Sequence, residues 1–110
     1  MDQMEFVNLI LAKAGEVGYR VNINRDGERR VVFDHKDLTA DHLRRVFQDI
    51  SRRKGLYCRE DMEELVKGRP CAVAPFFELA VKAGLCNEVV DGRRKFYQFN
   101  FGSKPAVSAA

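Results

Sequence analysis

Three short runs of basic residues could contact the phosphate groups of a nucleic acid. They consist of Arg44 and Arg45, of Arg52, Arg53 and Lys54, and of Arg93, Arg94 and Lys95. Lysine and arginine neutralise phosphates and supply the sequence-independent part of DNA binding. The net charge of +3, from 19 basic and 16 acidic residues, is modest. DNA binding therefore requires these side chains to share one surface, whereas each run on its own is also consistent with a solvated helix face or turn.

Few residues of the chain could support catalysis. The largest group of neighbouring carboxylates consists of Glu60, Asp61, Glu63 and Glu64. This group falls at the start of a predicted helix, where acidic side chains stabilise the positive end of the helix dipole. A glycine-rich phosphate loop and a nucleophile elbow are both missing from the sequence. We therefore expect neither an enzyme nor a bound cofactor.

The cysteines Cys58, Cys71 and Cys86 are odd in number and widely spaced. No Cys-x-x-Cys pair or paired histidines accompany them, so a metal site is not expected. The sequence also lacks a long apolar run and a leader in which charged residues precede apolar ones. These features indicate free thiols in a cytoplasmic protein without a membrane span. The alternative for Cys71 is redox sensing, which requires an exposed and reactive thiol.

The last basic run follows a predicted helix. Apolar residues between Phe76 and Leu85 recur at helical spacing, and Gly84 can adopt the left-handed conformation that ends a helix. Proline costs little at the first helical position, whereas inside a helix it removes a hydrogen bond. The helix is therefore predicted to begin near Pro75, after a loop over residues 68–74.

A β-hairpin is predicted directly after this helix. Val89 and Val90 precede Asp91-Gly92, the dipeptide favoured where both turn residues need positive φ. Residues 93–101 form the return strand, with basic residues near the turn and aromatic residues nearer the base. The tip of this hairpin is therefore expected to present three positive charges to solvent.

Shorter elements are predicted upstream of this helix and hairpin. Thr39 is a suitable N-cap, and an apolar stripe over residues 43–50 indicates a helix that ends at Gly55. A short strand over 56–58 and a second short helix over 59–67 follow. The resulting order is helix, short strand, helix, turn, helix, strand, turn, strand.

This order, together with the sequence KAGL, a DGRR turn and a KFY strand, resembles the winged helix-turn-helix superfamily. The most similar pattern is that of small bacterial repressors of the arsenical-resistance and multiple-antibiotic-resistance types, over residues 37–101. The resemblance implies that the helix within residues 70–83 enters the major groove and that the tip of the hairpin, called the wing, contacts the DNA backbone or the minor groove. The nucleic-acid-binding residues that it implies are Arg93, Arg94 and Lys95, with Lys67, Arg69, Arg52 and Arg53.

The groove helix itself lacks the side chains that read bases. Residues 70–77, PCAVAPFF, contain no arginine, lysine, asparagine, glutamine, serine or threonine to contact base edges. We therefore expect a DNA-binding protein with mainly phosphate contacts, such as a small transcriptional regulator or a phage or plasmid accessory factor. The alternative is a winged-helix module that binds a protein and not DNA, using exposed Val73, Phe76 and Phe77, although such residues also suit an ordinary core.

The first 36 residues predict an additional helix and β-hairpin. A helix follows the N-cap residue Asp2, and the hairpin occupies residues 19–34. The segment from Leu11 to Asp34 has the same plan as the last third of the chain. This similarity is consistent with an internal repeat, or with chance likeness between two helix-hairpin units. A lone hairpin is marginal in water, so we expect this one to pack on the rest of the chain, with a second subunit as a further option.

The predicted fold class is α+β, a winged helix-turn-helix with an extra N-terminal helix and β-hairpin. Residues 1–36 are expected to pack on a main domain of residues 37–101 through a short link, His35-Lys36-Asp37. Residues 102–110 are expected to form a flexible tail. Duplex DNA or a protein is the expected partner, a homodimer is an option, and no membrane contact is expected.

Overall fold

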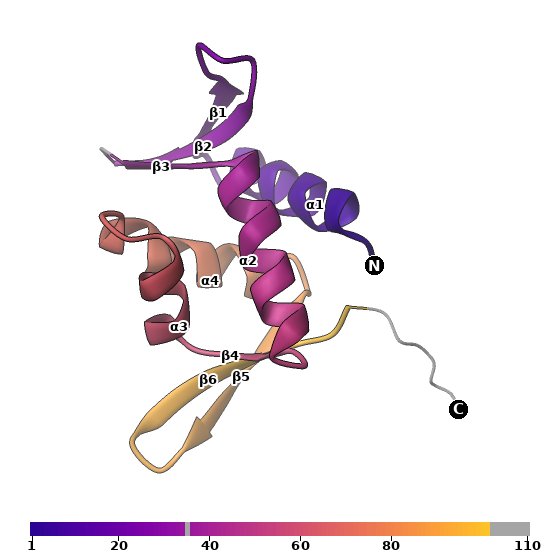
Figure 1. Cartoon of the computed structure of the whole chain (residues 1–110), viewed down its shortest axis with the longest axis vertical. Coiled ribbons are helices and arrows are strands. Elements are labelled where there is room, and N and C mark those ends of the chain that lie inside the picture. Colours follow the sequence, from indigo (N-terminus) through magenta and orange to yellow (C-terminus); the bar gives the residue numbers. More distant parts are fainter. Residues whose placement is uncertain (35, 102–110) are drawn as a thin grey trace.

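The computed structural model describes residues 1–34 and 36–101, which form an α+β fold of four α-helices and two antiparallel sheets (Figure 1). The N-terminal elements are α1 (Gln3–Glu16), β1 (Arg20–Ile23), β2 (Arg29–Phe33) and β3 (Lys36–Thr39). The following elements are α2 (Ala40–Arg52), β4 (Leu56–Tyr57), α3 (Arg59–Leu65), the 3-10 helix η1 (Pro70–Ala72), α4 (Val73–Lys82), β5 (Cys86–Asp91) and β6 (Arg94–Phe99). The predicted tail over 102–110 lies outside the described residues.

The N-terminal sheet has the order β1-β2-β3, with one strand more than the predicted hairpin. Lys36 and Asp37, which we expected in a link, belong to β3, where Asp37 pairs with Val32. The expectation was wrong because Lys36-Asp37-Leu38-Thr39 has no strand pattern of its own and is extended through pairing with the adjacent β2; His35 lies outside the described residues. Strand β3 runs into α2 without a linker, so the sheet is joined directly to the second half of the chain.

One side of this sheet is covered by helices. Val31, Phe33 and Leu38 are buried, but Val21 and Ile23 of the edge strand β1 are 37% and 66% exposed. The N-terminal hairpin therefore packs on the rest of the chain mainly through β2, whereas the edge strand β1 is largely exposed.

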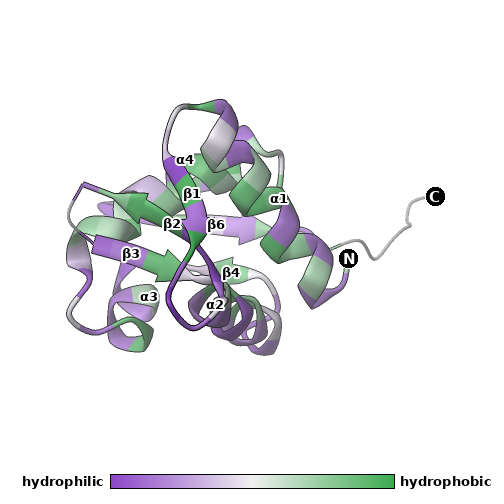
Figure 2. Ribbon diagram, turned by 90° about the horizontal axis from the view of Figure 1, so that it is seen from above, coloured by the Kyte–Doolittle hydropathy of each residue, from purple (hydrophilic) through white to green (hydrophobic). Residues whose placement is uncertain are grey.

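Helix α1 joins the two halves of the protein in one core. Asp2 forms the predicted N-cap, and the ring of Phe6 lies 5.3 Å from Phe47, 6.2 Å from Phe76 and 5.4 Å from Phe101, measured between centroids. Figure 2 shows apolar green and polar purple alternating around α1, as expected when one helix face is buried. Burial of such an aromatic side chain contributes roughly 1.5–3 kcal/mol.

The C-terminal sheet has the order β4-β6-β5 and is tied to the end of α2. Gly55, with φ of +91°, follows α2, and its carbonyl accepts a 2.7 Å hydrogen bond from the amide of Phe99. A Cβ atom at Gly55 would lie 2.5 Å from the carbonyl oxygen of Phe99. Glycine is therefore required here both by φ and by the close approach of β6.

Helix α4 begins earlier than predicted. It starts at Val73, directly after η1, so Pro75 is its third residue and not its first. The first four amides of an α-helix have no partner within the helix, so proline at this position removes no hydrogen bond. The predicted loop over 68–74 is consequently reduced to residues 68–69, because 70–72 form η1 and 73–74 belong to α4.

The turn of the β5–β6 hairpin also differs from the prediction. Asp91 pairs with Arg94, so the central turn residues are Gly92 and Arg93, and of these Gly92 alone has a positive φ, of 63°. A turn with glycine at the first central position needs one positive φ and not two. Asp91 is therefore the last residue of β5, and Arg93 occupies the tip of the hairpin.

The two hairpins lie at opposite ends of the longest axis of the molecule, which extends 44 Å (Figure 1). Residues 24–28 connect β1 to β2, whereas only Gly92 and Arg93 connect β5 to β6. The two hairpins, whose sequences follow the same plan, thus have turns of different length. Near the middle of the molecule, the amino group of Met1 donates a 2.7 Å hydrogen bond to the carbonyl of Phe101.

Candidate nucleic-acid interface

The tip of the β5–β6 hairpin carries three exposed basic side chains. Arg93, Arg94 and Lys95 are all exposed, and the guanidinium of Arg94 lies 5.0 Å from the ring centroid of Phe96. The Lys95 ammonium is 3.7 Å from a carboxylate oxygen of Glu88. Arg93 and Arg94 form no ion pair with any other described residue. Two guanidinium groups at the tip are therefore available to an external anion.

A fourth basic side chain, from α3, lies beside this tip. Arg59 and Glu60 line a pocket of about 170 Å³ together with Arg93, Arg94, Lys95 and Tyr97. Hydrogen bonding with its own backbone amide and with Cys58, aided by the charges of Arg94 and Arg59, lowers the pKa of Glu60 below its usual value. Glu60 therefore stays ionised near neutral pH, and the pocket holds four cations and one anion.

Arg59 was not among the residues predicted from the sequence. Its neighbours Glu60 and Asp61 suggested only an ordinary acidic helix start. The order of elements was the signal that could have identified Arg59, because this order places the start of α3 against the last hairpin. Arg59 is also 3.6 Å from Glu63, an exposed pair one helical turn away that is expected to be weak.

Arg52 and Arg53, by contrast, are engaged at the end of α2. Both pair with Asp49, which is only 4% exposed, and Arg53 reaches its second oxygen at 3.3 Å. Arg53 also lies 3.3 Å from Asp61 of α3 and so bridges two helices. These two arginines stabilise the α2–α3 junction, and neither lines the pocket at the hairpin tip.

Lys67 and Arg69 do not join the pocket either. Arg69 donates a 2.9 Å hydrogen bond to the backbone carbonyl of Asp37 and lies 3.6 Å from the carboxylate of the same residue. It thereby fastens the segment after α3 to strand β3. Lys67 forms an exposed pair with Glu64 at 3.3 Å. Arg69 thus has a structural role, whereas Lys67 lies on the surface away from the pocket.

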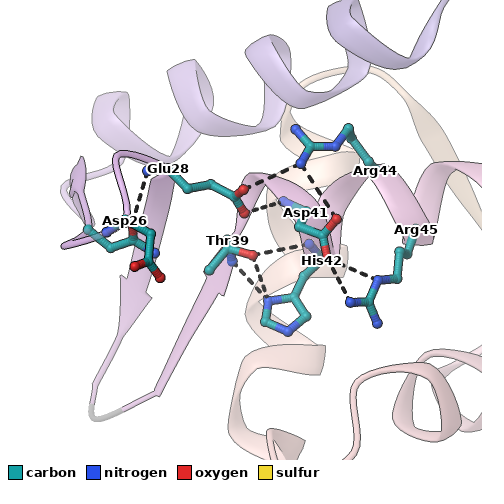
Figure 3. Close-up of polar contacts among 8 residues, drawn as sticks. Asp26, Glu28, Thr39, Asp41, His42, Arg44 and Arg45 are labelled. Atoms are coloured by element: carbon teal, nitrogen blue, oxygen red, sulfur yellow. Dashed lines mark hydrogen bonds and ion pairs between the residues drawn. The ribbon is translucent and has the colours of Figure 1, made fainter.

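The run Arg44-Arg45 lies in the first half of α2, roughly 10–12 Å from Arg52 along the helix axis. Figure 3 shows both arginines beside acidic partners: Arg45 is 2.7 Å from Asp41, and Arg44 is 3.4 Å from Glu28. Glu28 in turn accepts a 2.8 Å hydrogen bond from the amide of Asp41. This run is therefore largely neutralised and separate from the hairpin tip.

The surface proposed for a protein partner is not exposed. Val73, Phe76 and Phe77 are 0%, 0% and 1% exposed, and the ring of Phe77 stacks on Tyr97 with centroids 4.2 Å apart. The expectation of exposed aromatics at the start of α4 is wrong, because these side chains form the core between α4 and the C-terminal sheet. The exposed side of α4 carries mainly Ala74, Glu78, Val81 and Lys82.

The thiols offer little chemistry. Cys58 and Cys86 are buried, and burial raises the pKa of both, that of Cys86 to about 12. Cys71 is half-buried. Within residues 1–34 and 36–101, no three His, Cys, Asp or Glu side chains are grouped to hold a metal ion. Every helix in these same ranges is too short or too polar to span a lipid bilayer.

Comparison with protein-family models, with curated proteins and with solved structures finds no match to this chain. The geometry of its own residues is therefore the basis for a functional assignment. Arg59 and residues 93–95 bring four exposed basic side chains to one pocket, hereafter the tip pocket.

Proposed function

We propose that residues 37–101 form a winged helix whose wing, the β5–β6 hairpin, contacts the phosphate backbone of duplex DNA. The order of α2, β4, α3, α4, β5 and β6 and the sheet order β4-β6-β5 support this proposal. In the superfamily that the sequence resembles, the tip of this hairpin contacts the DNA backbone or the minor groove. The chain would act as a small transcriptional regulator or as a phage or plasmid accessory factor.

The observation that carries the proposal is the tip pocket. Arg93 and Arg94 form no ion pair among the residues described, although the carboxylate of Glu60 lines the same pocket, and Arg59 and Lys95 have only exposed, long-distance partners. Guanidinium groups bind phosphate oxygens through charge-assisted hydrogen bonds. A narrow two-stranded hairpin with such groups at its tip can approach a DNA groove and contact phosphates on either side.

Sequence specificity is expected to be low. The exposed face of α4 presents Ala74, Glu78, Val81 and Lys82, which provide little readout of base edges. Binding would then depend mainly on counterion release. With three phosphate contacts, a fourfold rise in salt concentration should weaken binding roughly 40-fold.

Fluorescence anisotropy of a labelled duplex at two salt concentrations tests the proposal. Arg93→Gln/Arg94→Gln should abolish most of the binding. The matched control is Arg25→Gln/Arg29→Gln, which removes two exposed arginines at the tip of the other hairpin and changes the net charge equally. Equal losses in both double variants would contradict a wing-specific contact, and absence of binding at low salt would eliminate duplex DNA as the ligand.

Arg59→Gln provides a separate test of the tip pocket. The side chain is exposed, so the substitution should leave the free energy of unfolding nearly unchanged. We expect weaker DNA binding and a shallower salt dependence, by about one phosphate contact. Unchanged affinity would restrict the contact to the hairpin alone.

A further inference from the structure

Strand β5 leaves one edge of the C-terminal sheet unpaired. It bonds to β6 on one side, and no described strand pairs with its other side. It is six residues long, contains neither lysine nor proline, and exposes Val89 by 41% and Val90 by 65%, together with the acidic Glu88 and Asp91. Native proteins usually protect such edges with charged side chains, most often lysine, or with proline, a bulge or a covering element, because an unprotected edge pairs with another chain.

A groove lies beside this edge, between α4 and the sheet. Its volume is about 200 Å³, and it is lined by Phe77, Glu78, Val81, Lys82, Glu88 and Tyr97. Phe77 and Tyr97 form an apolar floor, and Val81 is 40% exposed at the rim. The groove and the strand edge thus form one continuous surface with apolar and charged parts.

Two charged side chains of this surface can pair with the same two side chains of an identical surface. Glu78 and Lys82 lie one turn apart on the exposed side of α4. Neither forms an ion pair with another residue in the described parts of the chain. In a two-fold symmetric contact the same patch meets itself, so Glu78 can face Lys82 of the partner subunit, and Lys82 can face the partner's Glu78.

We propose that a second copy of this chain occupies this surface and forms a homodimer through antiparallel pairing of the two β5 strands. Pairing centred on Val89 sets Val89 opposite itself, Glu88 opposite Val90 and Asn87 opposite Asp91. No two acidic residues then face one another, and the two sheets become one sheet of six strands. The two-fold axis stands perpendicular to this sheet, so both copies of α4 lie on the same side.

This arrangement does not depend on DNA binding. It places the subunit contact on β5 and α4, away from the N-terminal hairpin at the other end of the molecule. It also gives a reason for the composition of the exposed α4 face, which would contact a subunit instead of bases. The turn residues Gly92 and Arg93 lie beyond the paired segment, and Arg94 and Lys95 belong to β6, which does not pair with the second copy.

Sedimentation equilibrium of the full chain without DNA, from micromolar to millimolar concentration, tests the proposal. We expect a reversible monomer–dimer equilibrium that Val90→Lys weakens by about tenfold or more. Ile23→Lys is the matched control, because Ile23 is a 66% exposed β-branched residue on the edge strand of the other sheet. This control should leave the dimer constant unchanged.

A charge exchange supplies an independent readout. Glu78→Lys alone should weaken the dimer, because it sets two lysines opposite one another, and Glu78→Lys/Lys82→Glu should restore it. A monomer at every concentration would overturn the proposal. A dimer insensitive to Val90→Lys, or equally sensitive to Ile23→Lys, would also overturn it. Because no DNA is present, none of these outcomes bears on the tip pocket.

Discussion

The hydroxyl of Tyr57 donates a 2.8 Å hydrogen bond to the carboxylate of Asp49, inside the junction of α2, β4 and α3. Burial by itself would raise the pKa of Asp49, but the hydrogen bonds from Tyr57 and Arg52 and the charge of Arg53 hold it below its usual value. Burial and the same hydrogen bond raise the pKa of Tyr57. The junction therefore keeps a buried carboxylate ionised by surrounding it with donors.

Tyr57→Phe should lower the free energy of unfolding by about 1.5–3 kcal/mol, because it removes a hydrogen bond to a buried charge. Urea denaturation measures this change. Tyr19→Phe is a suitable control, since the hydroxyl of Tyr19 donates no hydrogen bond to the residues that the structure describes. Equal effects of the two substitutions would show that Asp49 does not need the tyrosine hydroxyl.

His42 should make stability depend on pH. Its Nδ1 atom accepts a 3.0 Å hydrogen bond from the amide of Thr39 at the start of α2, which requires an unprotonated Nδ1 (Figure 3). Burial, with the charges of Arg69 and Arg45, lowers the pKa of His42 below 6.5. The folded state thus favours the neutral ring, and its contribution is complete above pH 6.5 and lost as the pH falls through the lowered pKa.

The substitution His42→Gln isolates this effect. Glutamine can also accept the hydrogen bond from the Thr39 amide, but it does not titrate. Between pH 7.5 and pH 5, the native chain should lose about 1 kcal/mol more stability than His42→Gln in urea denaturation. Parallel pH profiles for the two proteins would exclude His42 as the titrating group.

Gly55→Ala should destabilise the protein by about 2–4 kcal/mol, because a methyl group there combines a positive φ with an overlap against the Phe99 carbonyl. Gly84→Ala separates these causes. Gly84 has a φ of +75°, but a Cβ atom there meets no atom within 4 Å. Its substitution should cost only about 1–2 kcal/mol. Thermal or urea unfolding that ranks the two variants in the opposite order would contradict the close approach of β6.

The three thiols should differ in reactivity. In the native protein, Cys71 should react with Ellman's reagent first, because Cys58 and Cys86 are 4% and 3% exposed and have raised pKa values. Cys71→Ser should remove the fast phase, and full unfolding should expose all the remaining thiols. A native protein in which the three thiols react in one fast phase would contradict the packing around Cys58 and Cys86.

Elements specified by local signals could be predicted from the sequence. Asp2 and Thr39 are N-caps as expected, and the apolar stripes that follow them are buried. The short strand β4 and the helix α3 also lie where the pattern placed them. These predictions succeeded because capping and helical periodicity depend on residues only a few positions apart.

Features that depend on pairing between elements could not be predicted. Strand β3 exists because the neighbouring β2 pairs with it, and its own sequence, KDLT, carries no strand pattern. The same reason applies to the basic side chains. Arg53 and Arg69 are engaged by Asp49, Asp61 and Asp37, whereas Arg59 approaches the hairpin tip from another element. A count of charges along the chain does not distinguish an arginine held by a carboxylate from one facing solvent.

The hydrogen bond from the Met1 amino group to the Phe101 carbonyl brings residues 1 and 101 together. A short peptide joining them would connect two positions that already touch, so the order of elements along the chain could be rotated without moving any element. New ends placed within residues 24–28, an exposed connection remote from the core, would test this circular permutation. Native-like folding of such a chain would show that the three-dimensional arrangement, and not the order of synthesis, determines this architecture.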